Sequence, residues 1–129
     1  MSRIKEKVIL VVDDEPSIRQ VCSQVLAREG YQVDIATNSK IAQEILDIRE
    51  YDLCLIDIRT PAMNGFELYH WLKDNHPQQA ECVIFTSGDI YSKETEDNLQ
   101  QSGRNFLPKP FTTEELKLIV KEFFKEGER

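Results

Sequence analysis

Hydrophobic residues along the chain form two kinds of pattern that alternate from one end to the other. Short apolar runs, rich in β-branched residues and flanked by polar ones, are typical of strands buried in a parallel sheet. They predict five strands, at residues 8–12, 31–36, 53–56, 82–85 and 105–107. Between these runs, apolar residues recur every three or four positions, as on the buried face of a helix. The sequence therefore predicts regularly alternating strands and helices.

Residues that favour helix ends mark the boundaries of several of these helices. Gly30 suits the C-terminal cap of the first helix, because glycine adopts the left-handed conformation at low cost. Either Asn38 or Ser39 can cap the start of the second helix, and either Thr112 or Thr113 the start of the last. Three of the five predicted helices therefore begin or end within a residue or two of a suitable cap.

Five strand–helix units with no spare segment predict one α/β domain that covers residues 1–129. We expect a doubly wound, five-stranded parallel sheet with helices on both faces. Pro77 closes the third unit. The helix over residues 92–102 is weak, because it is largely polar and its clear apolar anchor is Leu99.

The charge of the chain narrows the range of partners. Its 129 residues include 23 acidic and 16 basic side chains, which give a net charge of -7. A nucleic-acid-binding surface needs clustered lysine and arginine, so no direct nucleic acid binding is expected. No apolar stretch approaches the roughly 18 residues of a membrane span, and the charged first residues do not resemble a signal peptide. We expect no membrane association.

The three cysteines indicate a reducing compartment. Cys22, Cys54 and Cys82 are odd in number, widely spaced and set in apolar runs. Buried free cysteines behave as small hydrophobic residues, so a metal or redox role is not expected. A cytoplasmic location fits this pattern best.

Polar side chains gather where the predicted strands end. Strand one leads into Asp13-Asp14-Glu15 and strand three into Asp57, while strand four ends in Thr86-Ser87-Gly88 and strand five in Lys109-Pro110. Ligands of open parallel sheets bind beyond the carboxyl ends of the strands. Because those ends share one edge, carboxylates, hydroxyls and one ammonium are expected to meet there.

This group of side chains suits phosphoryl transfer. Clustered carboxylates raise one another's pKa values unless a cation neutralises them, and a site with only oxygen ligands favours magnesium, Mg²⁺. A carboxylate beside Mg²⁺ can attack phosphorus and form an acyl phosphate. Lys109 can pair with one phosphoryl oxygen, and Thr86 or Ser87 can donate a hydrogen bond to another. Ser87 is equally consistent with an ordinary turn residue.

These motifs resemble the receiver domain of two-component response regulators, along nearly the whole chain and in the same order. The resemblance implies a flavodoxin-like sheet of order 2-1-3-4-5 and a phosphorylation-dependent signalling switch. The matching segments are Asp13-Asp14-Glu15, the run from Asp57 to Gly65, Thr86-Ser87 and Lys109-Pro110-Phe111.

The resemblance also implies roles for the residues at the acidic end of the site. Asp57 is implied as the phosphoacceptor. Asp14 would bind Mg²⁺ directly, and Asp13 directly or through water. Asp57 itself and the backbone carbonyl of Arg59 would complete the protein ligands.

Further roles follow by the same resemblance. Thr86 is implied as a switch hydroxyl that moves toward the phosphoryl group. Phe106 is implied as the aromatic residue that turns inward in response, although an aromatic on an edge strand can simply pack. A cis Lys109–Pro110 bond is implied, and it would aim Lys109 into the site.

The resemblance implies partners as well. A sensor histidine kinase or a histidine phosphotransfer protein would donate the phosphoryl group, and the domain would assist its own phosphorylation and dephosphorylation without being an enzyme. An unknown downstream protein would bind helix four, strand five and helix five, with helix four as the movable element. The domain could stand alone or belong to a longer chain such as a hybrid kinase.

The sequence departs from the usual receiver pattern at four positions. Thr60 stands where methionine is common, and Asn64 stands where aspartate often precedes the glycine. Phe106 lacks the hydroxyl of the frequent tyrosine, so its rotation could change only packing. Arg59, two residues after the phosphoacceptor, carries a long cationic side chain that we expect to affect the lifetime of the acyl phosphate.

Other functions fit the sequence less well. An aspartyl phosphohydrolase of the haloacid dehalogenase type needs a second acid two residues after the nucleophile, where this chain has Arg59. A flavin-binding module needs a Ser/Thr/Gly-rich loop after strand one, where three acids lie. A GTPase needs a phosphate-binding loop that the sequence lacks. His70 and His76 are expected to be solvated or packing residues rather than phosphohistidines.

Overall fold

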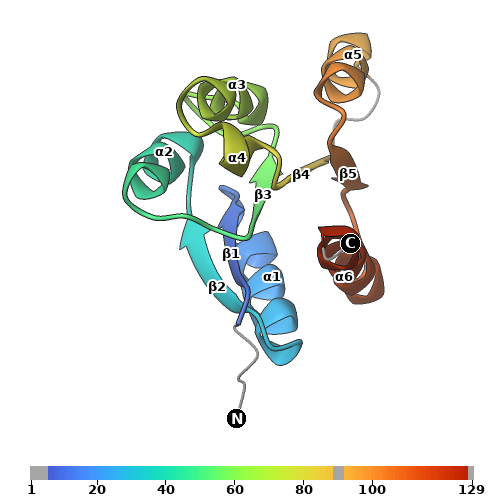
Figure 1. The fold of residues 1–129 in the computed structure, drawn as a ribbon. Helices are drawn as coiled ribbons and strands as arrows, with labels where there is room; N and C mark the ends of the chain where they lie inside the picture. The colour runs from blue at the N-terminus through green and yellow to red at the C-terminus, as the bar shows by residue number, and fades with distance from the viewer. Residues whose placement is uncertain (1–5, 89–91, 128–129) are drawn as a thin grey trace.

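The structure is a computed structural model, and residues 6–88 and 92–127 of it are described. Five strands form one parallel sheet in the order β2-β1-β3-β4-β5, which confirms the predicted fold (Figure 1). The strands are β1 (Val8–Val12), β2 (Gln32–Ala36), β3 (Leu53–Asp57), β4 (Val83–Ser87) and β5 (Asn105–Pro108). The helices are α1 (Pro16–Arg28), α2 (Ser39–Ile48), α3 (Gly65–Asn75), α4 (Pro77–Ala80), α5 (Lys93–Ser102) and α6 (Thr113–Gly127).

Helices cover both faces of the sheet, and each face has its own core. On one face, α2, α3 and α4 pack against the sheet through residues such as Leu46, Leu68 and Ala80. On the other, α1 and α6 do so through residues such as Leu26 and Leu116. Figure 1 shows α1 and α6 on the opposite side of the sheet from α2 and α3. The central strands β3 and β4 are buried throughout, as the continuous apolar runs predict.

The capping residues take the places that their chemistry favours. Gly30 has φ +97° after α1, and its N–H donates to the carbonyl of Ala27 while the N–H of Tyr31 donates to that of Leu26. These two bonds form a Schellman motif. Of the two candidates for α2, Asn38 is the N-cap and accepts from the N–H of Ile41 at 2.9 Å.

Two features differ from the prediction. A short helix, α4, follows Pro77 where a simple closing turn is expected, because the Gln79 side chain bonds both the N–H and the carbonyl of Tyr51 at 2.9 Å. The strand β4 begins at Val83 and extends to Ser87, so Thr86 lies within the strand rather than after it.

Helix α5 is weakly attached, as its polar sequence predicts. None of its described residues is buried, and Leu99 is the partly buried side chain that packs against the core. The Tyr69 hydroxyl adds a bond of 3.2 Å to the carbonyl of Ser102. Within the described part of the chain, no helix is long and apolar enough to cross a membrane.

The cysteines form no disulfide. All three are free thiols; Cys22 and Cys54 are buried, and Cys82 is half-buried. Burial raises the pKa of the Cys22 thiol to about 12, so this group stays protonated at neutral pH. Their placement agrees with the predicted packing role.

Candidate functional site

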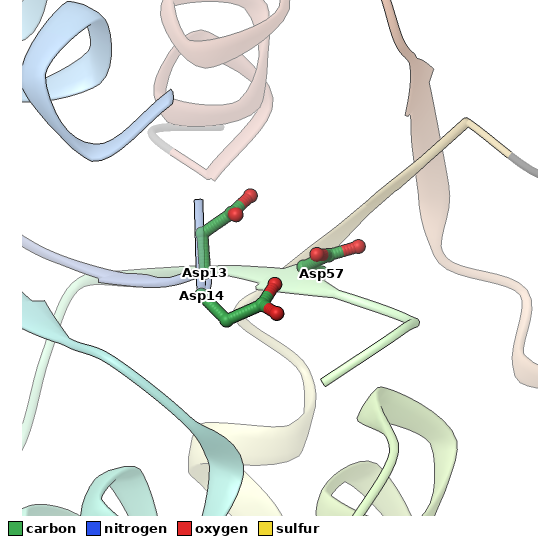
Figure 2. A group of neighbouring side chains, drawn as sticks. All are labelled: Asp13, Asp14 and Asp57. Carbon is green, nitrogen blue, oxygen red and sulfur yellow. The ribbon is translucent and has the colours of Figure 1, made fainter. Parts of the chain in front are cut away.

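Three aspartates meet at the carboxyl ends of β1 and β3, which are neighbouring strands. Asp13 and Asp14 follow β1 directly, and Asp57 is the last residue of β3. One carboxylate oxygen from each lies within 4.8 Å of the other two. Figure 2 shows the three side chains projecting from the adjacent strand ends into one region. Asp13 and Asp57 are buried at 1% and 2% exposure, whereas Asp14 is exposed.

Backbone amides fix the orientation of the two buried carboxylates. The N–H of Glu15 donates to Asp13 Oδ1 at 2.9 Å, and the N–H of Arg59 donates to Asp57 Oδ1 at 3.2 Å. The second oxygen of each carboxylate faces the ammonium of Lys109. The site is therefore preorganised in the same way on both strands.

Lys109 follows β5 directly, and its side chain reaches the carboxylates at the ends of β1 and β3. Its Nζ is 2.9 Å from Asp13 Oδ2, 2.9 Å from Glu15 Oε1 and 3.3 Å from Asp57 Oδ2, and its side chain is only 9% exposed. The Lys109–Pro110 bond is cis, as predicted, and the N–H of Lys109 donates to the carbonyl of Ser87 at 2.9 Å. The ammonium thus neutralises part of the carboxylate charge.

The electrostatics of the cluster follow from burial and like charge. Burial, followed by the nearby charge of Asp13, raises the pKa of Asp57 to about 6. Burial also raises the pKa of Asp13. For Lys109, burial opposes the charged form, but its bonds to Asp13 and Glu15 outweigh that effect and raise its pKa. The acids are under-neutralised by one lysine, a condition that a divalent cation would relieve.

Gly65 allows α3 to begin against the end of β3. A Cβ at this position would lie 2.6 Å from the carbonyl oxygen of Asp57 and 2.9 Å from the Cα of Ile58. Asn64 and Glu67 form a capping box that starts the helix there, with bonds of 2.9 and 3.0 Å. The sequence shows the Asn64-Gly65 turn, but the need for a residue without a side chain depends on this helix–strand contact.

Of the two predicted switch residues, Thr86 lies next to Asp57, whereas Phe106 lies on β5, on the far side of β4 from β3. Thr86 is paired with Asp57 in the β3–β4 register, is 5% exposed, and accepts from the N–H of Ile58 through its carbonyl at 2.9 Å. Phe106 on β5 is half-buried and packs against the core on the face of the sheet that α2 and α3 cover. Ser87 is fully buried. The register therefore places Thr86 beside Asp57 and Phe106 beside Phe85, the residue before Thr86.

A cavity of about 760 Å³ opens onto the cluster. Its lining includes Asp14, Asp57, Arg59 and Lys109, together with Glu15. The Arg59 side chain is exposed. Glu15 forms an ion pair with Lys109, a contact that the sequence does not predict. A long-range pair of this kind leaves no local signal in the sequence.

Neither histidine lines the cavity that opens onto the three aspartates. His70 is exposed on α3. His76 pairs with Asp47, with Nε2 2.8 Å from Oδ1, and its ring centroid is 5.1 Å from that of Trp71. Both therefore agree with solvated or packing roles.

The donor set fits a hard divalent cation. Asp13, Asp14 and Asp57 supply clustered carboxylate oxygens, which Mg²⁺ and Ca²⁺ prefer over the nitrogen and sulfur ligands of softer metals. The exposed Asp14 and the open cavity leave room for waters on the ion. The pocket can therefore bind a metal.

Comparison with known proteins agrees with this geometry. The response regulator receiver domain family matches residues 9–121. The response regulator protein PilR of Pseudomonas aeruginosa is 35% identical over 120 residues, which cover 93% of this chain and 26% of PilR. The transcriptional regulatory protein CrdR of Helicobacter pylori is 29% identical over 122 residues, 94% of this chain and 56% of CrdR. The chain thus spans about a quarter to a half of the length of these relatives.

Two solved single-domain structures share the fold over nearly their whole length. A CheY-like receiver domain protein from Methanospirillum hungatei superposes with a TM-score of 0.87 at 30% identity, covering 96% of this chain and 98% of that one. The chemotaxis protein CheY4 of Vibrio cholerae gives a TM-score of 0.81 at 26% identity, covering 92% and 99%. With its fold, its acidic pocket and its sequence in agreement, the chain belongs to the response regulator receiver domain family.

Proposed function

We propose that this receiver domain is a signalling switch in which Asp57 accepts a phosphoryl group from a phosphohistidine. The observation that carries the proposal is the placement of the buried Asp57 carboxylate beside Asp13, Asp14 and Lys109 on an open cavity. In the transfer, an Asp57 oxygen attacks phosphorus while the bond from phosphorus to the donor histidine nitrogen breaks. The nitrogen keeps the electron pair, and an aspartyl phosphate forms on Asp57.

The neighbouring residues divide the supporting roles. Asp13, Asp14, Asp57 and the carbonyl of Arg59 would hold Mg²⁺, which neutralises charge on the transferring phosphoryl group. Lys109, already 3.3 Å from Asp57, exchanges a carboxylate contact for a phosphoryl oxygen. The same groups would assist later hydrolysis, and the exposed Arg59 side chain would affect its rate.

The switch response involves the adjoining strands. Added negative charge at Asp57 draws the Thr86 hydroxyl toward it, and the Phe106 ring follows by repacking. The output surface would be α5, β5 and α6, which are the predicted helix four, strand five and helix five. Helix α5 would be the element that moves, because none of its described residues is buried. A downstream protein would bind this face, without direct contact to nucleic acid, in the cytoplasm.

Receiver domains interact with histidine kinases or phosphotransfer proteins, and either type of protein would be the donor here. The domain would cover residues 1–129, alone or within a longer chain. No observation favours the phosphohydrolase or flavin alternatives: Arg59 occupies the position of the second acid, and carboxylates occupy that of a flavin phosphate loop.

Intact mass after incubation with acetyl phosphate and Mg²⁺ tests the proposal. We expect the wild type to gain one phosphoryl group and Asp57→Asn to gain none. Asp74→Asn, which removes an exposed carboxylate at the far end of α3, is the matched control and should react like the wild type. A wild-type protein that stays unmodified with both acetyl phosphate and a phosphohistidine donor would contradict the proposed function.

A further inference from the structure

The loop between β3 and α3 contains an uncommon turn. The N–H of Met63 donates to the carbonyl of Pro61 at 2.8 Å, and Ala62 between them has φ 72°. A bond from residue i+2 back to residue i around a positive φ is the rarer and more strained form of γ-turn. Because alanine carries a Cβ, it disfavours this conformation. Such strain persists only where surrounding contacts enforce it.

Two buried hydroxyls supply those contacts. Thr60 Oγ1 donates to the carbonyl of Met63 and lies 2.7 Å from Ser39 Oγ. A hydroxyl has one proton, so Thr60 donates to Met63 and Ser39 must donate to Thr60. Ser39 is fully buried and Thr60 is 7% exposed, so water competes little for these bonds. The result is a directed chain from the first turn of α2 to the end of the γ-turn.

This chain of bonds reaches the residue next to the proposed metal ligand. Arg59 precedes Thr60, its N–H donates to Asp57, and it lines the same cavity as Asp14 and Asp57. The peptide plane that joins Arg59 to Thr60 carries the Arg59 carbonyl. The two hydrogen bonds of the Thr60 side chain therefore restrain the peptide plane that carries this carbonyl.

We propose that Ser39 and Thr60 are positioning residues of the metal site, whose hydroxyl chain braces the γ-turn and holds the Arg59 carbonyl toward the ion. The inference rests on the proposed function, in which that carbonyl is a ligand. Neither hydroxyl touches the metal. They act on the ion by orienting a residue that binds it, and residues in such positions commonly contribute 10-fold or more to metal affinity.

Calorimetric titration with Mg²⁺ tests the inference without phosphorylation. Thr60→Val keeps the branched shape but removes the proton, and we expect it to bind Mg²⁺ about 10-fold more weakly than the wild type. Thr60→Ser keeps the hydroxyl and should restore most of the affinity. Ser39→Ala should have a smaller effect than Thr60→Val, because Thr60 retains its bond to Met63.

Val120→Ala is the control for loss of stability alone. Val120 is fully buried in α6 on the other face of the sheet, so its truncation should lower the unfolding free energy in EDTA and leave Mg²⁺ affinity unchanged. A folded Thr60→Val protein with wild-type affinity would overturn the inference while leaving the proposed function intact. If Thr60→Val does not fold, Ser39→Ala decides: weaker binding supports the inference and equal binding overturns it. A wild type that binds no Mg²⁺ would contradict both.

Discussion

Replacement of Asp57 by asparagine should change how the stability of the metal-free protein depends on pH. The buried Asp57 carboxyl has its pKa raised from an ordinary 3.8 to about 6, so folding favours the protonated form. The stability that protonation contributes is fully present below pH 3.8 and is lost as pH rises through about 6. This difference between the folded and unfolded pKa values of Asp57 corresponds to at most about 3 kcal/mol of unfolding free energy.

Asparagine has nearly the same shape as aspartate and is neutral at every pH. The substitution therefore removes the loss of stability that ionisation of Asp57 causes. The unfolding free energy of Asp57→Asn, relative to the wild type, should therefore rise by about 2–3 kcal/mol between pH 4 and pH 7. Urea unfolding in EDTA, followed by the fluorescence of Trp71, measures it at each pH. Asp74→Asn, at an exposed position, controls for the loss of a carboxylate as such.

The change in this free-energy difference with pH is the test, rather than its value at one pH. Asparagine also alters the contacts with Lys109 and with the N–H of Arg59, and these offsets are present at both ends of the range. A constant difference between variant and wild type from pH 4 to pH 7 would refute the raised pKa of Asp57. A trend of the same size in Asp74→Asn would refute it as well.

Three other results are expected from the structure. Gly65→Ala should lower the unfolding free energy by about 1–3 kcal/mol, because the new Cβ would lie 2.6 Å from the carbonyl oxygen of Asp57. Gly88→Ala should change the unfolding free energy little, because the space around Gly88 is open. Equal effects of the two substitutions in urea unfolding would contradict this. Mg²⁺ should raise the melting temperature of the wild type at pH 7.5 and do so much less in Asp14→Asn, as thermal unfolding would show; an equal rise would exclude Asp14 as a ligand. Amides of residues 93–102 should exchange with deuterium much faster than those of β1, and equal protection would show that α5 is firmly held.

Much of the fold follows from local sequence because each strand–helix unit carries its own pattern. The apolar runs of β1 and β3 are continuous since both strands are buried on both faces, and Gly30 marks a helix end through its own backbone preference. The helix α4 was missed because its support comes from Gln79 bonding Tyr51, 28 residues earlier. Periodicity carries no information about such a contact.

The same distinction applies to the site. Asp13, Asp14 and Asp57 could be predicted to meet because parallel strands end at one edge of the sheet, and the structure places them within reach of a single ion. The ion pair of Lys109 with Glu15, and the hydroxyl pair of Ser39 with Thr60, could not be predicted. Both join residues from different strand–helix units, and their geometry depends on how the strand ends pack rather than on any spacing along the chain.

Chemical localisation of the phosphoryl group tests the proposed function most directly. The protein is incubated with phosphodonor and Mg²⁺, and borohydride then reduces the acyl phosphate so that the modified aspartate becomes homoserine, which peptide mass mapping locates. We expect homoserine at position 57 alone, and none when EDTA replaces Mg²⁺. Homoserine at Asp13 or Asp14 instead, or a pattern that is the same with and without Mg²⁺, would contradict Asp57 as the metal-dependent phosphoacceptor.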